Sequence, residues 1–383
     1  MSPRSRGVAQ PGSAFVWGTK GRRFKSGRSD QILSLGAGTP VAWLFPRGVG
    51  CRLDARSGLL LNAIPLSIPG LVGALQLWTE TAAGTASLIN HSENHTFRVD
   101  APFGETFSLR VHRPGYQSRA TIESELAWLT ALRRDTNLPV PRPIKGRNGQ
   151  LLQSFDSPGQ APRLAVLFDF APGHEPSPTS NLGELFVTLG GFAARMHQHA
   201  ICWHRPAGFV RQVWSADRIL DPTGLWGDWR AARDVTAEIR ATLDRLDVLL
   251  RRQLAEYGMS ADRFGLIHAD MRLGNLLVDG DHVTLIDFDD CGFCWFAYDF
   301  AAAISFHETH LAVPALKAAW LEGYRAIRSV SEADIAAMDT MVMLRRMALL
   351  AWIASHGETA LAQTHAPGFA LGTARLAERY MAR

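Results

Sequence analysis

Cysteine is scarce in this chain of 383 residues, which holds only four. So few cysteines in a protein of this size exclude a disulfide framework and indicate a reducing compartment, so we expect a cytoplasmic protein. Cys291 and Cys294 form a lone Cys-x-x-Cys pair. Without a second pair the spacing is weak evidence for zinc, and it lies outside the usual context of a redox motif, so we interpret both cysteines as packing residues.

A strong charge of one sign is also missing. The net charge is +4 and the pI is near 9.0, but ten of the forty basic residues fall within residues 1–60, beside only two acids. Residues 61–383 therefore carry thirty basic and thirty-four acidic groups, a net charge of about −4. A mildly acidic body lacks the basic surface that binds nucleic acid, so we exclude a nucleic-acid partner.

An uninterrupted membrane-spanning segment is absent too. The apolar run Leu59–Leu77 is long enough in principle to cross a bilayer. However, Pro65 and Pro69 interrupt it, and Asn62 and Gln76 are polar, which argues against a spanning helix. We therefore expect no membrane segment, and we expect the later part of the run to pack as a helix on the first folded lobe.

Residues 1–58 lack any sustained helical or strand period, because Gly, Ser, Pro and Arg are interleaved. The segment Val8–Gln31 resembles the peptide obtained when a transfer-RNA gene is translated as coding sequence. An Arg-rich, acid-poor start is also typical of organelle transit peptides, but we favour the first interpretation. We expect residues 1–78 to be a disordered or artefactual extension. No methionine lies between Met1 and Met196, so a later start would need another codon.

What the chain does contain is a concentrated set of polar side chains between Phe264 and Ile304. Five of them suit metal and proton chemistry: His268, Asp270, Asn275, Asp287 and Asp289. Among them, the apolar, β-branched run at 283–286 predicts a buried strand. Asp279-Gly280-Asp281 predicts a turn that joins it to an earlier strand at 276–278. We therefore expect a β-hairpin inside the polar segment.

The register of this hairpin brings two distant oxygen ligands together. If Asp279 pairs with His282, Asn275 lies opposite Ile286 and therefore beside Asp287. Mg²⁺ prefers one or two such amide or carboxylate ligands and leaves its other positions to water and phosphate. The hairpin therefore predicts a magnesium site for a phosphorylated ligand.

The order His-x-Asp-x-x-x-x-Asn followed by Ile-Asp-Phe is the catalytic layout of protein-kinase-like folds. In this chain it consists of His268, Asp270, Asn275 and Ile286-Asp287-Phe288. Phosphoryl transfer needs a carboxylate that orients and deprotonates the acceptor hydroxyl, and we assign this role to Asp270. We expect Asn275 and Asp287 to hold the metal. His268 is expected to hydrogen-bond the loop backbone rather than to react.

In detail the layout resembles the aminoglycoside phosphotransferase and choline kinase family of small-molecule kinases. That family lacks the arginine that follows the histidine in protein kinases, and Ala269 stands there in this chain. Its metal-binding aspartate precedes an apolar residue and an acid, as in Asp287-Phe288-Asp289. The resemblance covers roughly residues 80–360. It implies an α+β, two-lobed protein-kinase-like fold, with a small antiparallel-sheet N-lobe and a mainly helical C-lobe, that binds ATP and Mg²⁺ between the lobes.

Local patterns predict the elements of both lobes: a hairpin within 84–99, strands at 107–111 and 164–170, and helices at 120–133, 182–199 and 231–257. By the resemblance, Arg110 pairs with the ATP phosphates, at a position where the family more often has lysine. Glu125 or Glu123 of the following helix holds this arginine by an ion pair. The hairpin loop has no Gly-x-Gly-x-x-Gly, so its backbone N–H groups and Ser92 are the expected phosphate contacts.

The last strand of the N-lobe leads into Ala171, where the resemblance places the hinge between the lobes. The carbonyl of Asp169 and the N–H of Ala171 are then expected to contact adenine, with Phe168 behind the pocket. This gives a nucleotide-binding N-lobe at residues 79–170. The C-lobe, residues 171–383, is expected to carry catalysis and acceptor binding.

Several polar residues of the C-lobe are expected to have structural roles. Asp299 resembles the acid that braces the catalytic loop in the family. His197 and His199 are two residues apart on a predicted helix and point in different directions, so we interpret them as solvent or interlobe contacts. The alternating charges of the 231–257 helix indicate a solvated face. Polar residues of the last helices, Arg345 among them, are interpreted as packing residues.

The resemblance implies an enzyme that moves the γ-phosphate of ATP to a hydroxyl of a small molecule. Aminoglycoside, homoserine, choline-like amine, sugar and macrolide acceptors all remain open. A Ser/Thr protein kinase of the bacterial stress-response type is an alternative, which the absence of an Ala-Pro-Glu activation segment makes less favoured. A non-catalytic nucleotide-binding module is disfavoured because Asp270, Asn275 and Asp287 are all present. The sequence does not predict an oligomeric state.

Overall fold

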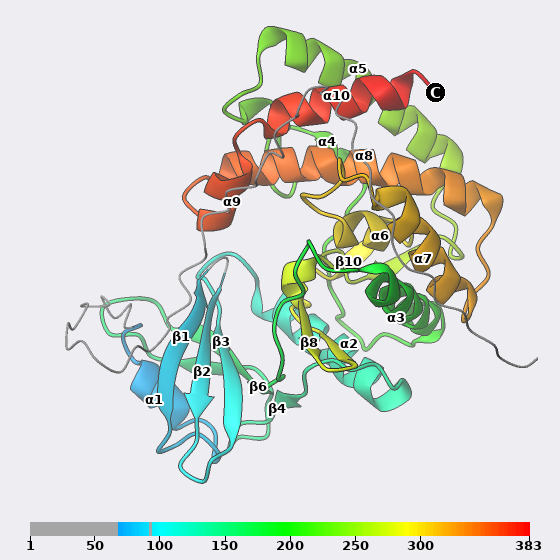
Figure 1. Cartoon of the computed structure of the whole chain (residues 1–383). Helices are drawn as coiled ribbons and strands as arrows, with labels where there is room; N and C mark the ends of the chain where they lie inside the picture. Colours follow the sequence, from blue (N-terminus) through cyan, green and yellow to red (C-terminus); the bar gives the residue numbers. More distant parts are fainter. Residues whose placement is uncertain (1–67, 92–93) are drawn as a thin grey trace, which may run out of the picture. The chain divides into compact units, whose positions relative to one another are not determined.

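The computed structural model describes residues 68–91 and 94–383. Their elements form an N-lobe built on an antiparallel sheet and a C-lobe built mainly of helices (Figure 1). This is the two-lobed α+β arrangement that the sequence predicts. Most of the expected N-terminal extension and the proposed phosphate contact Ser92 lie outside the described residues.

The N-lobe sheet is antiparallel throughout, with the strand order β1-β2-β3-β6-β4 and with β5 paired to β6. Its strands are β1 (Thr85–His91), β2 (His95–Asp100), β3 (Thr106–Val111), β4 (Pro143–Ile144), β5 (Gln153–Phe155) and β6 (Arg163–Asp169). Phe97, Val99 and Leu109 face the lobe's core and are almost fully buried, as their alternation with polar residues requires. Helix α2 (Arg119–Asp135) follows β3, close to its expected bounds.

Residues 68–78 belong to the N-lobe, so the expected boundary at residue 79 needs correction. Helix α1 (Leu71–Leu75) packs its buried leucine into the same core as the sheet. Trp78 is fully buried, and its indole Nε1 donates a hydrogen bond of 3.1 Å to the carbonyl of Ile144. The end of the apolar run therefore covers the sheet. In the described part of the chain, no helix is both long and apolar enough to cross a membrane.

The C-lobe carries most of the helices and two small two-stranded sheets. The helices are α3 (Gly183–Cys202), α4 (Ala216–Leu220), α5 (Ala237–Tyr257), α6 (Tyr298–Ala303), α7 (Val313–Arg325), α8 (Glu332–Ser355), α9 (Ala360–His365) and α10 (Phe369–Met381), with 3₁₀ turns η1 (Trp229–Ala231) and η2 (Leu273–Asn275). The strand pairs are β7 (Phe264–Ile267) with β10 (Gly292–Trp295), and β8 (Leu276–Asp279) with β9 (His282–Leu285). Helix α8 contacts α4, α5, α6, α9 and α10 and is the centre of this lobe (Figure 1).

Two glycines allow α3 and α7 to pack backbone against backbone. A Cβ atom on Gly190 would lie 2.0 Å from the carbonyl oxygen of Trp320, and one on Gly323 would lie 1.8 Å from that of Val187. Both distances are far shorter than any van der Waals contact, so no other residue fits at either position. This close approach fixes α3 against α7, and α3 also contacts β7 and places His197 beneath the loop that follows β7.

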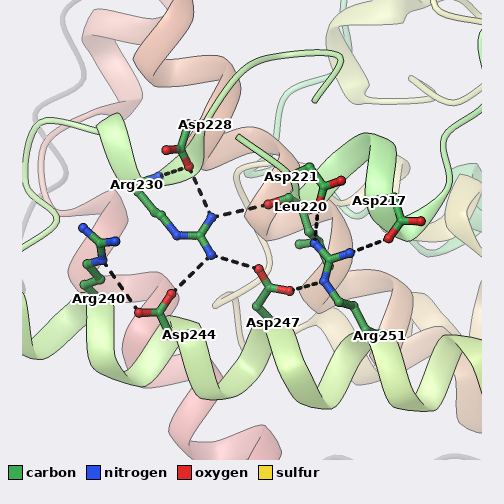
Figure 2. A network of polar contacts seen from close by, with 9 residues as sticks. All are labelled: Asp217, Leu220, Asp221, Asp228, Arg230, Arg240, Asp244, Asp247 and Arg251. Carbon is green, nitrogen blue, oxygen red and sulfur yellow. Dashed lines mark hydrogen bonds and ion pairs between the residues drawn. The ribbon is translucent and has the colours of Figure 1, made fainter. Parts of the chain in front are cut away.

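The solvated face that the alternating charges predict for α5 is present, since Glu238, Arg240 and Arg252 are exposed, but some of the helix's other charges are paired. The helix begins at Ala237, six residues later than expected, where Thr236 accepts a hydrogen bond from the Ile239 N–H. Asp247 is largely buried and accepts hydrogen bonds from both Arg230 and Arg251. Figure 2 shows how these two arginines extend the network to acids of α4, η1 and α5. The charges therefore join three segments.

The corrected N-terminal boundary gives a test of stability. Truncating Trp78 to alanine should lower the free energy of unfolding by about 3–5 kcal/mol, because it removes a fully buried indole and its hydrogen bond. Val72→Ala, in the same segment but 77% exposed, should change it by less than about 0.5 kcal/mol. Urea denaturation of the two variants makes the comparison. If both variants lowered the free energy of unfolding by equally small amounts, residues 68–78 would not be part of the N-lobe.

Candidate active site

The loop that follows β7 is held by one buried carboxylate. Ala269 has a φ of 68°, a left-handed conformation that is uncommon for a residue with a side chain. Asp299 accepts hydrogen bonds from the N–H groups of His268, at 3.3 Å, and Ala269, at 2.8 Å. Its Oδ2 also lies 3.0 Å from His197 Nε2. Asp299 therefore braces the loop, as expected, whereas His197 is fully buried beneath it and not an interlobe contact.

His268 links the loop to the metal-site hairpin. Its Nδ1 accepts a hydrogen bond of 3.2 Å from the N–H of Asp270, and its Nε2 lies 3.1 Å from the carbonyl of Ile286. These partners require the tautomer with the proton on Nε2, because the backbone donates to Nδ1. Burial lowers the pKa of His268, which keeps the ring neutral. The expectation that His268 bonds the backbone is confirmed.

Asp270 has both carboxylate oxygens in hydrogen bonds. Arg345 Nη2 lies 2.5 Å from Oδ1, while Asn275 Nδ2 and Arg272 Nε lie 2.6 Å and 3.2 Å from Oδ2. Burial opposes ionisation of this carboxyl, but Arg345 and Arg272 outweigh it and hold the pKa of Asp270 below its ordinary value. Asp270 is therefore an anion with a fixed orientation at the edge of the cleft.

The hairpin β8–β9 has the register predicted from its turn. Asp279 pairs with His282, and the N–H of Ile286 donates a 2.9 Å hydrogen bond to the carbonyl of Asn275. Asp287 comes next, with a φ of 62°, so the chain turns sharply at this residue. Asn275 and Asp287 therefore lie at the same edge of the hairpin, and both line one cleft with Asp270.

The donor set of this edge fits a hard dication whose coordination is completed by phosphate and water. Asn275 uses its amide nitrogen to bond Asp270, which leaves the amide oxygen for a metal. Asp287 keeps 45% of its side-chain surface accessible from the cleft. Within residues 68–91 and 94–383, no three His, Cys, Asp or Glu side chains converge to hold a metal by themselves. One carboxylate and one amide suit Mg²⁺ carried by a nucleotide better than a closed protein site.

Asp287 also shows that carboxylates outnumber arginines at the hairpin edge. Loss of hydration among the cleft walls raises the pKa of Asp287 to about 7; Arg110 opposes this rise, and the carboxylates of Asp289 and Glu125 add to it. A group with such a shift in a cleft is typical of a functional site. The local excess of carboxylates favours a bound cation.

Arg110 pairs with Glu125, which decides between the two glutamates that the sequence left open. Arg110 Nη2 lies 2.6 Å from Glu125 Oε1, and both side chains are buried. Glu123 is about half exposed and pairs instead with Arg119. Burial disfavours the charged arginine, but Glu125 and the aspartates of the cleft more than offset this, so the pKa of Arg110 lies above its ordinary value. Arg110 Nη1 also reaches to 3.6 Å from Asp287.

The expected adenine contacts also line the cleft, which has a volume of about 750 Å³. Asp169 and Ala171 lie where β6 runs into the C-lobe, and Phe168 is buried beside them. The carboxylate of Asp169 accepts a 2.6 Å hydrogen bond from the N–H of Arg142. Its side chain is therefore engaged with the N-lobe, which leaves backbone groups to meet a ligand.

Asp289 connects the two lobes through hydrogen bonds, whereas Asn275 and Asp287 lie at the hairpin edge. Asn94, at the end of the β1–β2 loop, donates through Nδ2 to Asp289 Oδ2 at 3.0 Å. Gln117 donates to the carbonyl of Asp289 at 3.3 Å. The hairpin that covers the cleft is thereby tied to the loop that carries Asp287.

Part of the cleft has an aromatic lining built by residues of the C-lobe, where the acceptor site is expected. Trp226, Phe306 and Trp352 line it with Leu349. Phe306 has a φ of 69° and stacks on His365, with the ring centroids 4.0 Å apart. Strain of this kind persists only where packing imposes it. In the sequence, Leu349 and Trp352 of α8 are three residues apart and so share a helix face, but this spacing is the same as that of ordinary core residues.

Known proteins resemble this chain over most of its described length. The sequence model of the phosphotransferase enzyme family matches residues 85–333. A microcompartment-associated aminopropanol kinase of known structure is 42% identical, with a TM-score of 0.75, and the match covers 82% of this chain and 97% of that one.

Two curated relatives share lower identity over shorter alignments. Homoserine kinase from Gluconobacter oxydans (strain 621H) is 30% identical over 57% of this chain and 66% of its own length. Amicoumacin kinase from Bacillus subtilis (strain 168) is 25% identical over 51% and 55%. The alignments thus leave a third or more of both curated relatives unmatched.

The two glutamates of α2 form a matched pair for testing the buried ion pair. Glu125→Gln should lower the free energy of unfolding by about 3–5 kcal/mol, because Arg110 would remain charged and buried without its partner. Glu123→Gln removes only an exposed i,i+4 pair and should cost less than about 0.5 kcal/mol. Chemical denaturation distinguishes them. A smaller loss for Glu125 than for Glu123 would contradict the assignment.

Proposed function

The chain belongs to the phosphotransferase enzyme family, and we propose that it transfers the γ-phosphate of ATP to a hydroxyl of a small amino alcohol, with Mg²⁺. The observation that carries this proposal is the convergence of Asp270, Asn275 and Asp287 on one cleft. The N-lobe, residues 68–170, binds the nucleotide, and the C-lobe, residues 171–383, supplies catalysis and the acceptor site.

In this proposal Asn275 and Asp287 hold Mg²⁺ through an amide and a carboxylate oxygen. When bound, the ion neutralises charge on the β- and γ-phosphates. Arg110 adds a fixed positive charge beside the phosphates, and Glu125 keeps its guanidinium in place at 2.6 Å. Backbone groups of Asp169 and Ala171 bind adenine at the hinge.

Asp270 accepts a hydrogen bond from the acceptor hydroxyl and orients its oxygen toward the γ-phosphorus. The bond from that oxygen to phosphorus forms as the bond to the oxygen bridging the β- and γ-phosphates breaks, which releases ADP. The hydroxyl proton passes to the Asp270 carboxylate and then to solvent. Such a reaction depends mainly on positioning and on neutralising charge, and this cleft is built for both.

The proposed acceptor class is supported by the 42% identical aminopropanol kinase, whose length the match almost fully covers. The aromatic side chains of Trp226, Phe306 and Trp352 line the same cleft, and aromatic rings attract cations such as the ammonium group of an amino alcohol. We therefore name aminopropanol as the first acceptor to test.

The test is acceptor-dependent release of ADP by the full chain with Mg-ATP. Aminopropanol, homoserine, choline and an aminoglycoside are compared, and the phosphorylated product is identified by mass spectrometry. Turnover is expected with aminopropanol. Transfer of labelled phosphate onto the protein itself would support a protein kinase instead, and nucleotide binding without transfer to any acceptor would support a non-catalytic module.

Replacing either aspartate of the reaction centre should abolish most of the activity. We expect Asp270→Asn and Asp287→Asn each to lower kcat by on the order of 10²-fold or more, because one removes the hydroxyl's acceptor and the other a metal ligand. Asp281→Asn, in the exposed turn of the same hairpin, is the control and should leave kcat unchanged. Steady-state ADP release measures all three. Near-normal turnover in both site variants would end this mechanism.

A further inference from the structure

One face of α8 lines the far end of the cleft. Arg345, Leu349 and Trp352 all border it, at spacings of four and three residues. At 3.6 residues per turn these side chains lie within about 60° of one another around the helix axis. Arg346 is about 100° away and faces another part of the lobe. Two adjacent arginines of one helix thus have different surroundings.

Two of the three guanidinium nitrogens of Arg345 bind the catalytic loop. Its side chain is 2% exposed, and its Nη2 lies 2.5 Å from Asp270 Oδ1. Nη1 donates to the carbonyl of Ala269 at 3.3 Å, and Nε donates to Ser305 Oγ at 3.0 Å. The guanidinium also lies over the ring of Trp226, 5.2 Å from its centroid. One side chain therefore contacts the reacting carboxylate, the strained loop and the aromatic lining.

Arg346 is equally buried but makes no contact with that loop. Its Nη1 pairs with Glu308 Oε2 at 2.6 Å, and its Nε donates to Thr373 Oγ1 at 2.9 Å. Its guanidinium lies over the ring of Phe369, 3.5 Å from the centroid. These contacts attach α10 to α8. Arg346 thus has the burial and ion pairing of Arg345 without any link to Asp270.

We propose that Arg345 is a positioning residue for phosphoryl transfer, which fixes the Asp270 carboxylate relative to the acceptor hydroxyl. The proposal rests on the function proposed above. Asp270 Oδ2 is held by Asn275 and Arg272, so Oδ1 is the oxygen whose direction Arg345 sets. Because the two oxygens are bound by different side chains, the carboxylate cannot rotate about the Cβ–Cγ bond.

The planar fork of arginine is what makes this hold possible. Three nitrogens donate in fixed directions to Asp270, Ala269 and Ser305, and a lysine ammonium has only one nitrogen to place. Lysine at this position keeps the charge but loses the geometry. A misplacement of about 1 Å in a reacting group costs on the order of 10²-fold in rate. The substitution Arg345→Lys therefore separates positioning from charge.

The first experiment compares Arg345→Lys with Arg346→Lys in the full chain, using Mg-ATP and aminopropanol. Arg345→Lys should lower kcat by about 10- to 100-fold and leave KM for ATP within about twofold, because the nucleotide contacts are untouched. Arg346→Lys should keep kcat within about threefold. Thermal unfolding of both variants measures stability separately, and comparable losses there are expected.

The second experiment restores the missing group chemically. Free guanidinium at about 20 mM, far below the molar concentrations that unfold proteins, should raise kcat of Arg345→Ala by about tenfold or more. The same concentration of sodium chloride, and guanidinium added to Arg346→Ala, should have no such effect. Recovery of rate by the missing group is not expected of a residue that only supports the fold.

Two results would overturn the proposal: an Arg345→Lys enzyme with wild-type kcat, or equal losses of kcat in both lysine variants without guanidinium rescue. Failure of the wild-type chain to phosphorylate aminopropanol or any other acceptor is a different outcome. It would remove the proposed function, and this inference with it, before any variant is compared.

Discussion

The active site depends on the hydrogen bonds that Asp299 accepts from the backbone of the loop after β7. Holding Ala269 in a left-handed conformation costs about 1–3 kcal/mol, and hydrogen bonds to a charged group contribute about 1.5–3 kcal/mol each. Two such bonds offset the strain, and His197, from α3, fixes the carboxylate from below. The loop is therefore shaped before any ligand arrives, and Asp270 starts from a rigid backbone.

The charges in the cleft suit the proposed magnesium nucleotide. Asp270 is already neutralised by two arginines, whereas Asp287 is half open to the cleft and has only a 3.6 Å contact with Arg110. The buried Glu125 takes up most of the positive charge of Arg110. The uncompensated carboxylate is thus at the hairpin edge, where the proposed metal binds. Binding of the proposed metal nucleotide would therefore also neutralise the Asp287 carboxylate.

Sequence predicted the local geometry of the site well, because turn chemistry and alternation fix a hairpin's register over a few residues. Asn275 and Asp287 were placed beside each other on that ground alone. For Arg345 the sequence predicts only packing, because its partner Asp270 is 75 residues away and α8 is buried on nearly every face, without a polar stripe. His197 was misjudged for the same reason: only the tertiary fold places Asp299 beside it. Trp78 is a third case. It follows a segment with little periodic pattern, and only the tertiary fold provides the sheet that buries it.

Asp287 and Asp289 are only two residues apart, but their carboxylates make different contacts. Asp287, just after β9, adopts a left-handed conformation, and its side chain lines the cleft. Asp289 contacts the N-lobe, where Asn94 donates to it, so the loop carrying the proposed metal ligand also holds the β1–β2 hairpin. A shift of this loop would therefore move Asp287 and the β1–β2 hairpin together. Placement of the proposed metal ligand and closure of the nucleotide hairpin are therefore mechanically linked, and the short spacing of the two acids is what links them.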